Sequence, residues 1–249
     1  MSWTAQDIVI KVKNKTLLDV AEIRLPEKQI TAIIGANGAG KSTLLKALRG
    51  LYHHISPHFQ QQSVKAMTAQ GKIAFVGQHE SFNTPLSVME YVLLGRFPHL
   101  SWFAKPNEQD IENAKKILSD YEIGHLSGSP IQTLSGGEKQ RAAVVRALMQ
   151  DTALIALDEP CNHLDIRHQH KLMSDLKTRS QNNDLTAIIV LHDLNLASRY
   201  ADYIVLLDGG KLTAAGTPDE VMTSEILSAA YRWRIDVLSH HNNAIYFAA

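Results

Sequence analysis

The sequence is poor in cysteine and in long apolar runs. Cys161 is its single cysteine, which excludes an intrachain disulfide and suits a reducing compartment. Its apolar runs, such as residues 187–191 and 203–207, have the length of a strand, whereas a membrane-spanning helix needs about 20 apolar residues. The N-terminus has no apolar stretch of signal-peptide length. We therefore expect a soluble protein that reaches a membrane only through a partner.

An excess of charge of either sign is also absent. The chain carries 25 basic and 25 acidic residues, so no net field steers it toward nucleic acid or anionic lipid. Hydrophobic residues make up 45% and charged residues 20% of the 249 residues, ordinary values for a folded domain with a sizeable core. This length fits one large domain or one domain with an inserted lobe.

Strand and helix patterns alternate along much of the chain. We expect strands at 8–10, 29–34, 72–76, 154–157, 186–191, 204–207 and 211–214, and helices at 41–48, 138–149 and 165–179. The alternation in the second half is typical of parallel βαβ units. Residues 51–70 are rich in His and Gln and predict no regular element.

Residues 87–121 have a helical pattern instead. The apolar positions Ile111, Ala114, Ile117, Leu118 and Tyr121 recur at spacings of three and four behind Asn107, a candidate helix cap. Pro98 and Pro106 divide this region into two helical pieces. We interpret it as a helical lobe inserted into an α/β core.

Residues 35–42 read GANGAGKS and fit the phosphate-loop pattern G-x-x-x-x-G-K-[ST]. The pattern follows a strand and opens a helix, so that backbone N–H groups can turn toward phosphate oxygens. Lys41 would reach the β- and γ-phosphates and Ser42 would bind Mg²⁺. A plain glycine turn before a helix would explain neither residue. The predicted ATP-binding residues are Gly35, Ala36, Asn37, Gly38, Ala39, Gly40, Lys41, Ser42 and Thr43.

The apolar run 154–157 ends in Asp158 and Glu159. A carboxylate at the end of a buried strand beside a phosphate loop is a Mg²⁺ ligand in nucleotide hydrolases. Glu159 can then polarise an attacking water as general base. The alternative is a solvated acidic pair, which the phosphate loop disfavours. The two patterns together predict a nucleoside triphosphatase without deciding its kind.

Residues 134–138, LSGGE, lie one helix before that strand. Alone, a Ser-Gly-Gly turn before a helix is an ordinary cap. Together with Gln78 and His192 it closely resembles the signature turn of the ABC ATPases, here Ser135, Gly136, Gly137 and Glu138.

The resemblance covers nearly the whole chain and implies a fold. This is an α/β P-loop NTPase core with a mainly parallel sheet, an N-terminal antiparallel β part and an inserted helical lobe. It also implies one ABC ATPase domain over 1–249, with the core in about 1–80 and 151–249 and the lobe in about 84–150.

The family pattern further implies roles for single residues. Gln78 would contact Mg²⁺, together with Ser42 and Asp158, and sense the membrane partner. Asp165 would cross the dimer interface, and His192 would hold the γ-phosphate and the attacking water, completing a catalytic set with Lys41 and Glu159. Alone, Gln78 could be a polar strand end and His192 a buried strand histidine, but all these landmarks occur in the family's order.

In the family the signature turn acts in trans. Ser135 and Gly137, at a helix N-terminus, form a second anion-binding turn, which would face the γ-phosphate held by the other subunit. ATP would thus join two copies as a homodimer across two ATP molecules. Catalysis would be completed only when the dimer closes.

Segments outside these motifs resemble the ATPases of iron-siderophore, haem and cobalamin importers. They are residues 93–99, 164–169, 191–202 and 216–222. The resemblance implies a peripheral subunit on the cytoplasmic face of the inner (plasma) membrane. Its partners would be membrane permease subunits and, indirectly, a substrate-binding protein, with no nucleic acid.

Two segments depart from the family pattern. Most members stack adenine on an aromatic residue of the early strands, but residues 10–15 contain none. Val12 is a weaker apolar substitute, and Trp3 could fold over the site instead. Residues 56–62 also lack the family's glycine-flanked hairpin.

Other residues keep two interpretations. The histidines His53, His54, His58, His240 and His241 could sense a metal but are more simply solvated. Cys161 is expected to be structural rather than redox-active. The aromatic group Phe97, His99, Trp102 and Phe103 could be core or a permease contact.

Three other classes of protein remain as alternatives. A non-transport ABC ATPase acting on nucleic acid or ribosomes usually has two cassettes or a coiled-coil insertion, and basic surfaces. A non-hydrolysing nucleotide-binding module would not need both Glu159 and His192. An exporter half usually fuses the permease to the cassette.

Overall fold

The computed structural model describes residues 2–13, 15–78, 85–101, 103–182, 185–240 and 243–248, with only the backbone of residues 2, 239–240 and 243–248. Its central sheet has the order β10-β9-β3-β8-β7-β6, and every neighbouring pair except β9 and β10 is parallel. The strands are β3 (Ile30–Ile34), β6 (Ile73–Val76), β7 (Leu154–Asp158), β8 (Thr186–Val190), β9 (Tyr203–Asp208) and β10 (Lys211–Gly216). The predicted mainly parallel sheet is confirmed.

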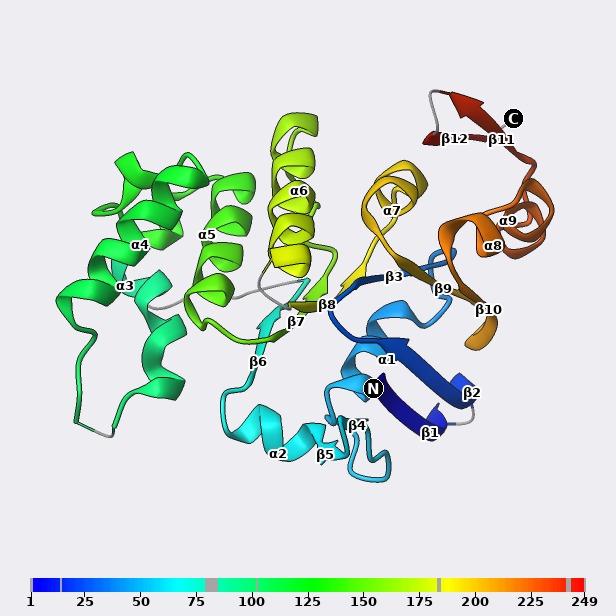
Figure 1. The fold of residues 1–249 in the computed structure, drawn as a ribbon, viewed down its shortest axis with the longest axis horizontal. Helices are drawn as coiled ribbons and strands as arrows, with labels where there is room; N and C mark the ends of the chain where they lie inside the picture. Colours follow the sequence, from blue (N-terminus) through cyan, green and yellow to red (C-terminus); the bar gives the residue numbers. More distant parts are fainter. Residues whose placement is uncertain are drawn as a thin grey trace.

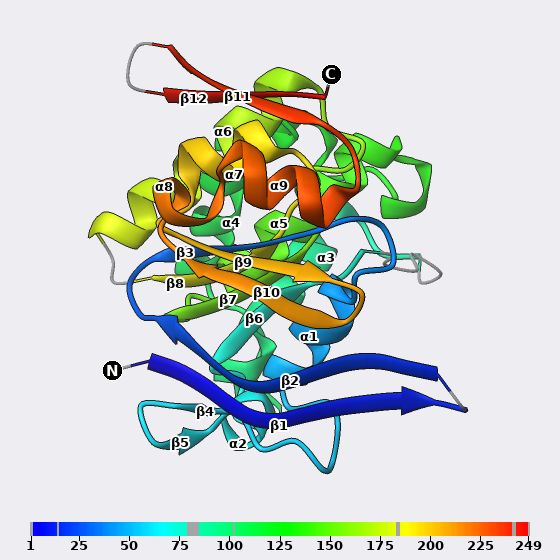
Figure 2. The same ribbon diagram turned by 90° about the vertical axis from the view of Figure 1, so that its right-hand side faces the viewer.

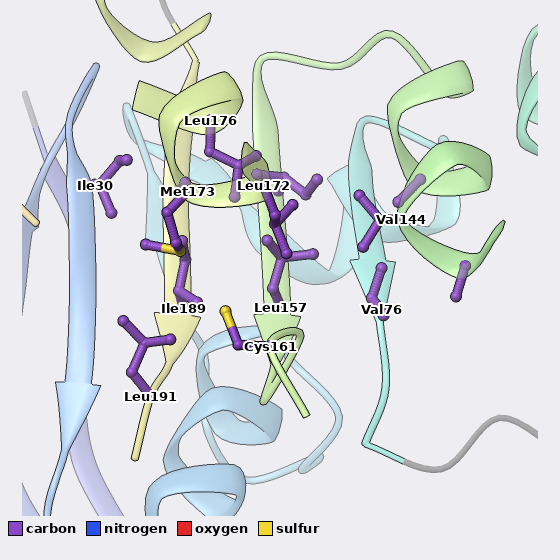
Figure 3. Packing of buried hydrophobic residues seen from close by; sticks show 14 of the residues in the cluster. Ile30, Val76, Val144, Leu157, Cys161, Leu172, Met173, Leu176, Ile189 and Leu191 are labelled. Carbon is purple, nitrogen blue, oxygen red and sulfur yellow. The ribbon is translucent and has the colours of Figure 1, made fainter. Parts of the chain in front are cut away.

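The central strands are buried on both faces. Alternate residues of a strand point to opposite sides, so Leu157 and Ile189 belong to one core cluster, while Ala156 and Ile188 belong to the other. Figure 3 shows the first cluster from close by, with Cys161 among its side chains. Burial raises the pKa of the Cys161 thiol to about 12, which fits the structural interpretation of this residue.

The second core cluster lies between the central sheet and a second, antiparallel sheet of order β2-β1-β4-β5. Helix α1 (Lys41–Leu48) lies between the two sheets (Figures 1 and 2). The strands are β1 (Ser2–Val12), β2 (Lys15–Pro26), β4 (His58–Phe59) and β5 (Gln62–Ser63). The N-terminal antiparallel part is thus confirmed, although β1 is longer than predicted and β2 was not predicted as a strand.

The segment 51–70 is regular from residue 58 on, which corrects the prediction from sequence. It contains β4, β5 and helix α2 (Val64–Ala69), which is capped by Ser63. The strand register leaves Gln60 and Gln61 as a two-residue turn, and both have a positive φ, of 49° and 67°. Such turns usually carry Asn-Gly because most side chains disfavour positive φ. Because this turn carries two glutamines instead, the sequence pattern did not predict the hairpin.

The helices between β6 and β7 lie together at one end of the molecule (Figure 1). They are α3 (Val88–Leu93), the 3₁₀ helix η1 (Leu94–His99), α4 (Glu108–Asp120), the 3₁₀ turns η2 (Gly124–Leu126) and η3 (Ile131–Thr133), and α5 (Gly136–Met149). Asn107 caps α4 as predicted and accepts a hydrogen bond from Asp110 N–H at 2.9 Å. Gly95 lets η1 approach α5, since a Cβ atom there would lie 2.2 Å from the Arg146 carbonyl oxygen.

The remaining helices cover the face of the central sheet opposite α1 (Figure 1). They are α6 (Ile166–Asn182), α7 (Leu194–Tyr200), α8 (Pro218–Val221) and α9 (Ser224–Tyr231). A hairpin that the sequence analysis did not predict follows them, with β11 (Ile235–His240) and β12 (Asn243–Ala248). Among the described residues, no helix is both long and apolar enough to cross a bilayer.

The Gln60-Gln61 turn yields a stability prediction. Gln61→Gly should stabilise the fold by up to about 1 kcal/mol, because glycine adopts positive φ without steric cost. Gln62→Gly is the matched control: Gln62 is exposed on β5, so glycine there should destabilise by about 0.5–1 kcal/mol. Urea unfolding of both variants measures the difference, and equal destabilisation by the two would contradict the strained turn.

Candidate functional site

Four neighbouring parallel strands, β3, β8, β7 and β6, end at the same edge of the central sheet. Open α/β sheets bind ligands at this carboxyl edge. The phosphate loop follows β3, Asp158 ends β7, His192 follows β8, and Gln78 follows β6. The pocket there has a volume of about 280 Å³ and is lined by Asn37, Gly38, Gly40, Lys41, Ser42, Thr43, Gln78, Glu159 and His192. The pocket thus brings together residues that are far apart in the sequence.

The phosphate loop begins at Gly35, whose φ is +144°. A Cβ atom there would lie 2.2 Å from the Leu207 carbonyl oxygen on β9, so a side chain would collide with backbone. Gly38 and Gly40 also have positive φ, 79° and 100°, which favours glycine. These conformations turn the chain back on itself before α1 begins at Lys41.

Lys41 is buried, with 5% of its surface exposed. Its ammonium group donates hydrogen bonds to the carbonyl oxygens of Gly35 (2.9 Å) and Ala36 (3.1 Å). Burial lowers the pKa of Lys41, while the charges of Glu159 and Asp158 oppose that shift. The lysine is therefore held at the loop as a positive charge whose polar partners come from the loop backbone.

The side chain of Ser42, which lines the pocket, is in direct contact with that of Asp158. The Ser42 hydroxyl donates to Asp158 Oδ1 at 2.8 Å. Burial raises the pKa of Asp158, with the charge of Glu159 adding to that rise and the Ser42 hydrogen bond opposing it. A hydroxyl and a carboxylate at this spacing are oxygen donors suited to Mg²⁺.

Glu159 is the hub of the polar network. It accepts hydrogen bonds from Gln78 Nε2 (2.8 Å) and Asn162 Nδ2 (2.6 Å), and His192 Nε2 lies 2.6 Å from its Oε1. Its backbone has a positive φ of 54°, an uncommon conformation for a non-glycine residue that often occurs at functional sites. The three side chains hold the carboxylate in one orientation.

The neighbouring carboxylates of Asp158 and Glu159 have pKa values shifted in opposite directions. Burial by itself raises the pKa of Glu159, but the hydrogen bonds and charge of His192 and the hydrogen bonds of Asn162 and Gln78 outweigh it, so the net shift is downward. Glu159 is therefore ionised at neutral pH and can accept a proton.

The signature turn lies at the N-terminus of α5 and outside the pocket wall. Ser135 and Glu138 form a reciprocal capping box: the Ser135 N–H donates to Glu138 Oε2 (2.8 Å), and the Glu138 N–H donates to Ser135 Oγ (3.4 Å). Gly137 packs on the loop that follows Glu159, since a Cβ atom there would lie 2.8 Å from the His163 carbonyl oxygen. Ser135 and Gly136 are exposed.

Asp165 is exposed just before α6. It accepts hydrogen bonds from His168 N–H (2.9 Å) and lies 2.8 Å from His168 Nδ1. The next residue, Ile166, is 75% exposed.

A family model described as ABC transporter matches residues 18–162. The chain belongs to the ABC transporter family. It is 36% identical to the ferric enterobactin transport ATP-binding protein FepC of Escherichia coli strain K12, over 90% of this chain and 84% of that protein. It is 34% identical to the hemin import ATP-binding protein HmuV of Photobacterium damsela subsp. piscicida, over 98% and 95%. ABC transporter ATP-binding proteins are ATPases coupled to transport, and this chain is one of them.

Solved structures of ABC transporters have the same fold. A metal-chelate type ABC transporter in an inward-facing conformation is similar with a TM-score of 0.82 and 27% identity, over 100% of this chain and 96% of that chain. The dimeric ABC cassette MJ0796 is similar with a TM-score of 0.75 and 25% identity, over 86% and 98%.

The structure excludes one of the two candidates for the adenine contact of this ABC ATPase, and it bears on the histidines. Trp3 cannot fold over the nucleotide, because it is fully buried and its Nε1–H donates to the Leu48 carbonyl oxygen at 3.0 Å. Val12 is 53% exposed. Among the described residues, no group of three or more His, Cys, Asp or Glu side chains could hold a metal ion. The His240 side chain and His241 lie outside the described residues.

The residues of the aromatic group in the helical region differ in their surroundings. Phe97 and Phe103 are 54% and 93% exposed, so they do not belong to the core. His99 Nε2 bonds to the Gln150 carbonyl oxygen, and Trp102 lies outside the described residues.

Two residues of this site escaped the sequence analysis. Asn162 binds the Glu159 carboxylate, and the Tyr231 hydroxyl accepts a hydrogen bond from Gly35 N–H at 3.1 Å. Asn162 could have been suspected because it lies one turn after Glu159. Tyr231 gives no local signal, since 196 residues separate it from Gly35.

Gly35 and Gly38 form a matched pair for testing the loop geometry. Gly35→Ala should cost about 3 kcal/mol or more of unfolding free energy and abolish ATP binding, because the methyl group collides with backbone. Gly38→Ala should cost only about 1 kcal/mol, since nothing lies within 4 Å of its Cβ position. Urea unfolding and calorimetric titration with ATP measure both. Equal effects at the two positions would rule out the collision as the cause.

Proposed function

We propose that this ABC ATPase powers the uptake of an iron chelate, haem or a cobalamin-type compound through a separate membrane permease. It acts as two copies on the cytoplasmic face of the inner membrane, with a substrate-binding protein delivering the cargo. The cargo class is supported by the relatives, which include a ferric enterobactin transporter subunit and a hemin importer subunit. The balanced charge of the chain gives no reason to add a nucleic acid partner.

The observation that carries the mechanism is the Glu159 network beside the phosphate loop. Lys41 and the loop amides bind the phosphates of ATP. Glu159 is ionised and takes a proton from the attacking water. His192, 2.6 Å from Glu159, holds that water and the γ-phosphate in line. Three groups that share one carboxylate keep these positions within a narrow range.

The cation expected with ATP is Mg²⁺. Ser42, Asp158 and Gln78 would hold it, and their hydroxyl, carboxylate and amide oxygens suit a hard cation. Ser42 and Asp158 already lie within 2.8 Å of each other. When bound, Mg²⁺ neutralises negative charge on the phosphates.

Dimerisation follows from where the signature turn lies. Ser135, Gly136, Gly137 and Glu138 are outside their own chain's pocket, yet they begin a helix of 14 residues whose N-terminus suits an anion. A second copy can place this turn against the γ-phosphate. The exposed Asp165 and Ile166 would then lie in the contact between the copies.

The permease contact is proposed for the helical lobe, residues 84–150, acting as one unit beside the core formed by 1–80 and 151–249. Leu94, Phe97 and Phe103 of this lobe are exposed to 38%, 54% and 93%. Exposed aromatic side chains are typical anchors of protein interfaces.

ATP-dependent dimerisation tests the function directly. Glu159→Gln should lower kcat at least about 100-fold, because the general base is lost, and should trap ATP between two copies. Size-exclusion chromatography with light scattering should show monomers becoming dimers when ATP and Mg²⁺ are added.

The control uses arginine at two serines of the helical lobe in the Glu159→Gln background. Ser135→Arg should abolish the dimer by blocking the signature turn. Ser119→Arg changes an exposed serine at the end of α4 and should leave the dimer intact. A variant that binds ATP but stays monomeric would show that the permease is needed or that Ser135 is wrongly assigned.

Base selectivity tests the adenine contact. Because Val12 offers little surface for stacking, ATP and GTP should bind with Kd values within about threefold of each other. Val12→Tyr should tighten ATP binding about fivefold, since stacking on an aromatic ring contributes about 1 kcal/mol or more. Val9→Tyr, at another exposed valine of β1, should not. Strong preference of the unmodified protein for ATP in equilibrium titrations would count against this hypothesis.

A further inference from the structure

The C-terminal helix α9 touches the phosphate loop at its first residue. The Tyr231 hydroxyl, at the end of α9, accepts a hydrogen bond from Gly35 N–H at 3.1 Å. Gly35 is buried, so removal of the hydroxyl would leave its N–H group without a hydrogen-bond partner, which is energetically costly. Neither the phosphate-loop pattern nor the other motifs of the chain include this tyrosine.

Gly35 is held at three points. Its N–H donates to Tyr231, its carbonyl accepts from Lys41 Nζ at 2.9 Å, and the Leu207 carbonyl of β9 occupies the space that a side chain at this position would need. Of these contacts, only the Tyr231 hydrogen bond comes from outside the central sheet and the loop. Burial raises the pKa of Tyr231 to about 12, with the Gly35 hydrogen bond opposing the shift, so the hydroxyl stays neutral in the physiological pH range.

The position of Tyr231 depends on the rest of the C-terminal segment. Within α9, Ser228 Oγ accepts from Ile235 N–H at 2.9 Å and Ser224 Oγ accepts from Val237 N–H at 3.0 Å. Strand β11 is thereby fixed to α9, and β12 packs beside α7, the helix that follows His192. Residues 224–240 and 243–248 thus connect the beginning of the phosphate loop with α7, the helix after His192.

We infer that Tyr231 is a positioning residue for the phosphate loop: its hydroxyl holds Gly35 N–H, so that the loop amides are preorganised for phosphate, and the C-terminal segment thereby belongs to the nucleotide-binding machinery. The inference rests on nucleotide binding at this loop. Preorganisation acts on binding rather than on proton transfer, so it predicts a change in affinity with little change in kcat.

Tyr231→Phe tests the inference because it removes the hydroxyl and keeps the ring. Calorimetric titration should show Mg-ADP and Mg-GDP binding about fivefold more weakly than to the unmodified protein, the effect of one lost hydrogen bond. The factor should be the same for both nucleotides, since Gly35 belongs to the phosphate loop and both nucleotides carry the same phosphates. The kcat for ATP should change less than twofold.

The matched control is Tyr200→Phe. Tyr200 also makes one hydroxyl hydrogen bond, with His170 Nδ1 at 2.9 Å, and does not line the pocket. The Tyr200→Phe variant should lose about as much thermal stability as Tyr231→Phe and should keep its nucleotide affinity. Unchanged affinity in Tyr231→Phe, or an equal loss in Tyr200→Phe, would overturn the inference.

Hydrogen exchange gives a second readout that needs no substitution. Because coupling between two sites is reciprocal, Mg-ADP should slow amide exchange in residues 224–233 of the unmodified protein. Exchange in this segment that ignores Mg-ADP, while the nucleotide binds, would contradict the coupling. If the unmodified protein did not bind Mg-ADP at all, the result would instead contradict the proposed nucleotide-binding site, on which the inference rests.

Discussion

The backbone of Gly35 is the constraint on which the site depends. Its N–H donates a hydrogen bond to Tyr231 and its carbonyl accepts one from Lys41. The Leu207 carbonyl lies where a side chain would be, so only glycine fits at this position. A loop fixed at its first residue keeps its amides in place without help from a ligand, so little conformational entropy is lost when phosphate binds. Asp158, Glu159 and His192 lie next to this loop, at the ends of the neighbouring strands β7 and β8.

Two adjacent carboxylates acquire different properties from their surroundings alone. Asp158 lies deeper and has one hydrogen-bonding hydroxyl, so burial dominates and its pKa rises. Glu159 turns away at a positive φ and meets three polar side chains, which lower its pKa despite burial. Two acids that are adjacent in the sequence thus differ in their affinity for a proton because of the groups around them.

Local patterns predicted the parallel sheet and the residues around the pocket, because each motif lies at the end of one strand and parallel strands end together. The rest depended on contacts that leave no local pattern. The Gln60-Gln61 hairpin has the wrong residues for its backbone conformation, and the burial of Trp3 is decided by packing between β1 and α1. Tyr231 reaches the loop only through the tertiary fold.

The burial of Cys161 has a practical consequence for studying two copies together. As the chain's single thiol, it lies in the core with a pKa raised to about 12, so little reactive thiolate forms at neutral pH. A cysteine introduced on the surface would therefore be the one position that a spin label or fluorophore modifies. The natural sequence already serves as the background for distance measurements between paired subunits.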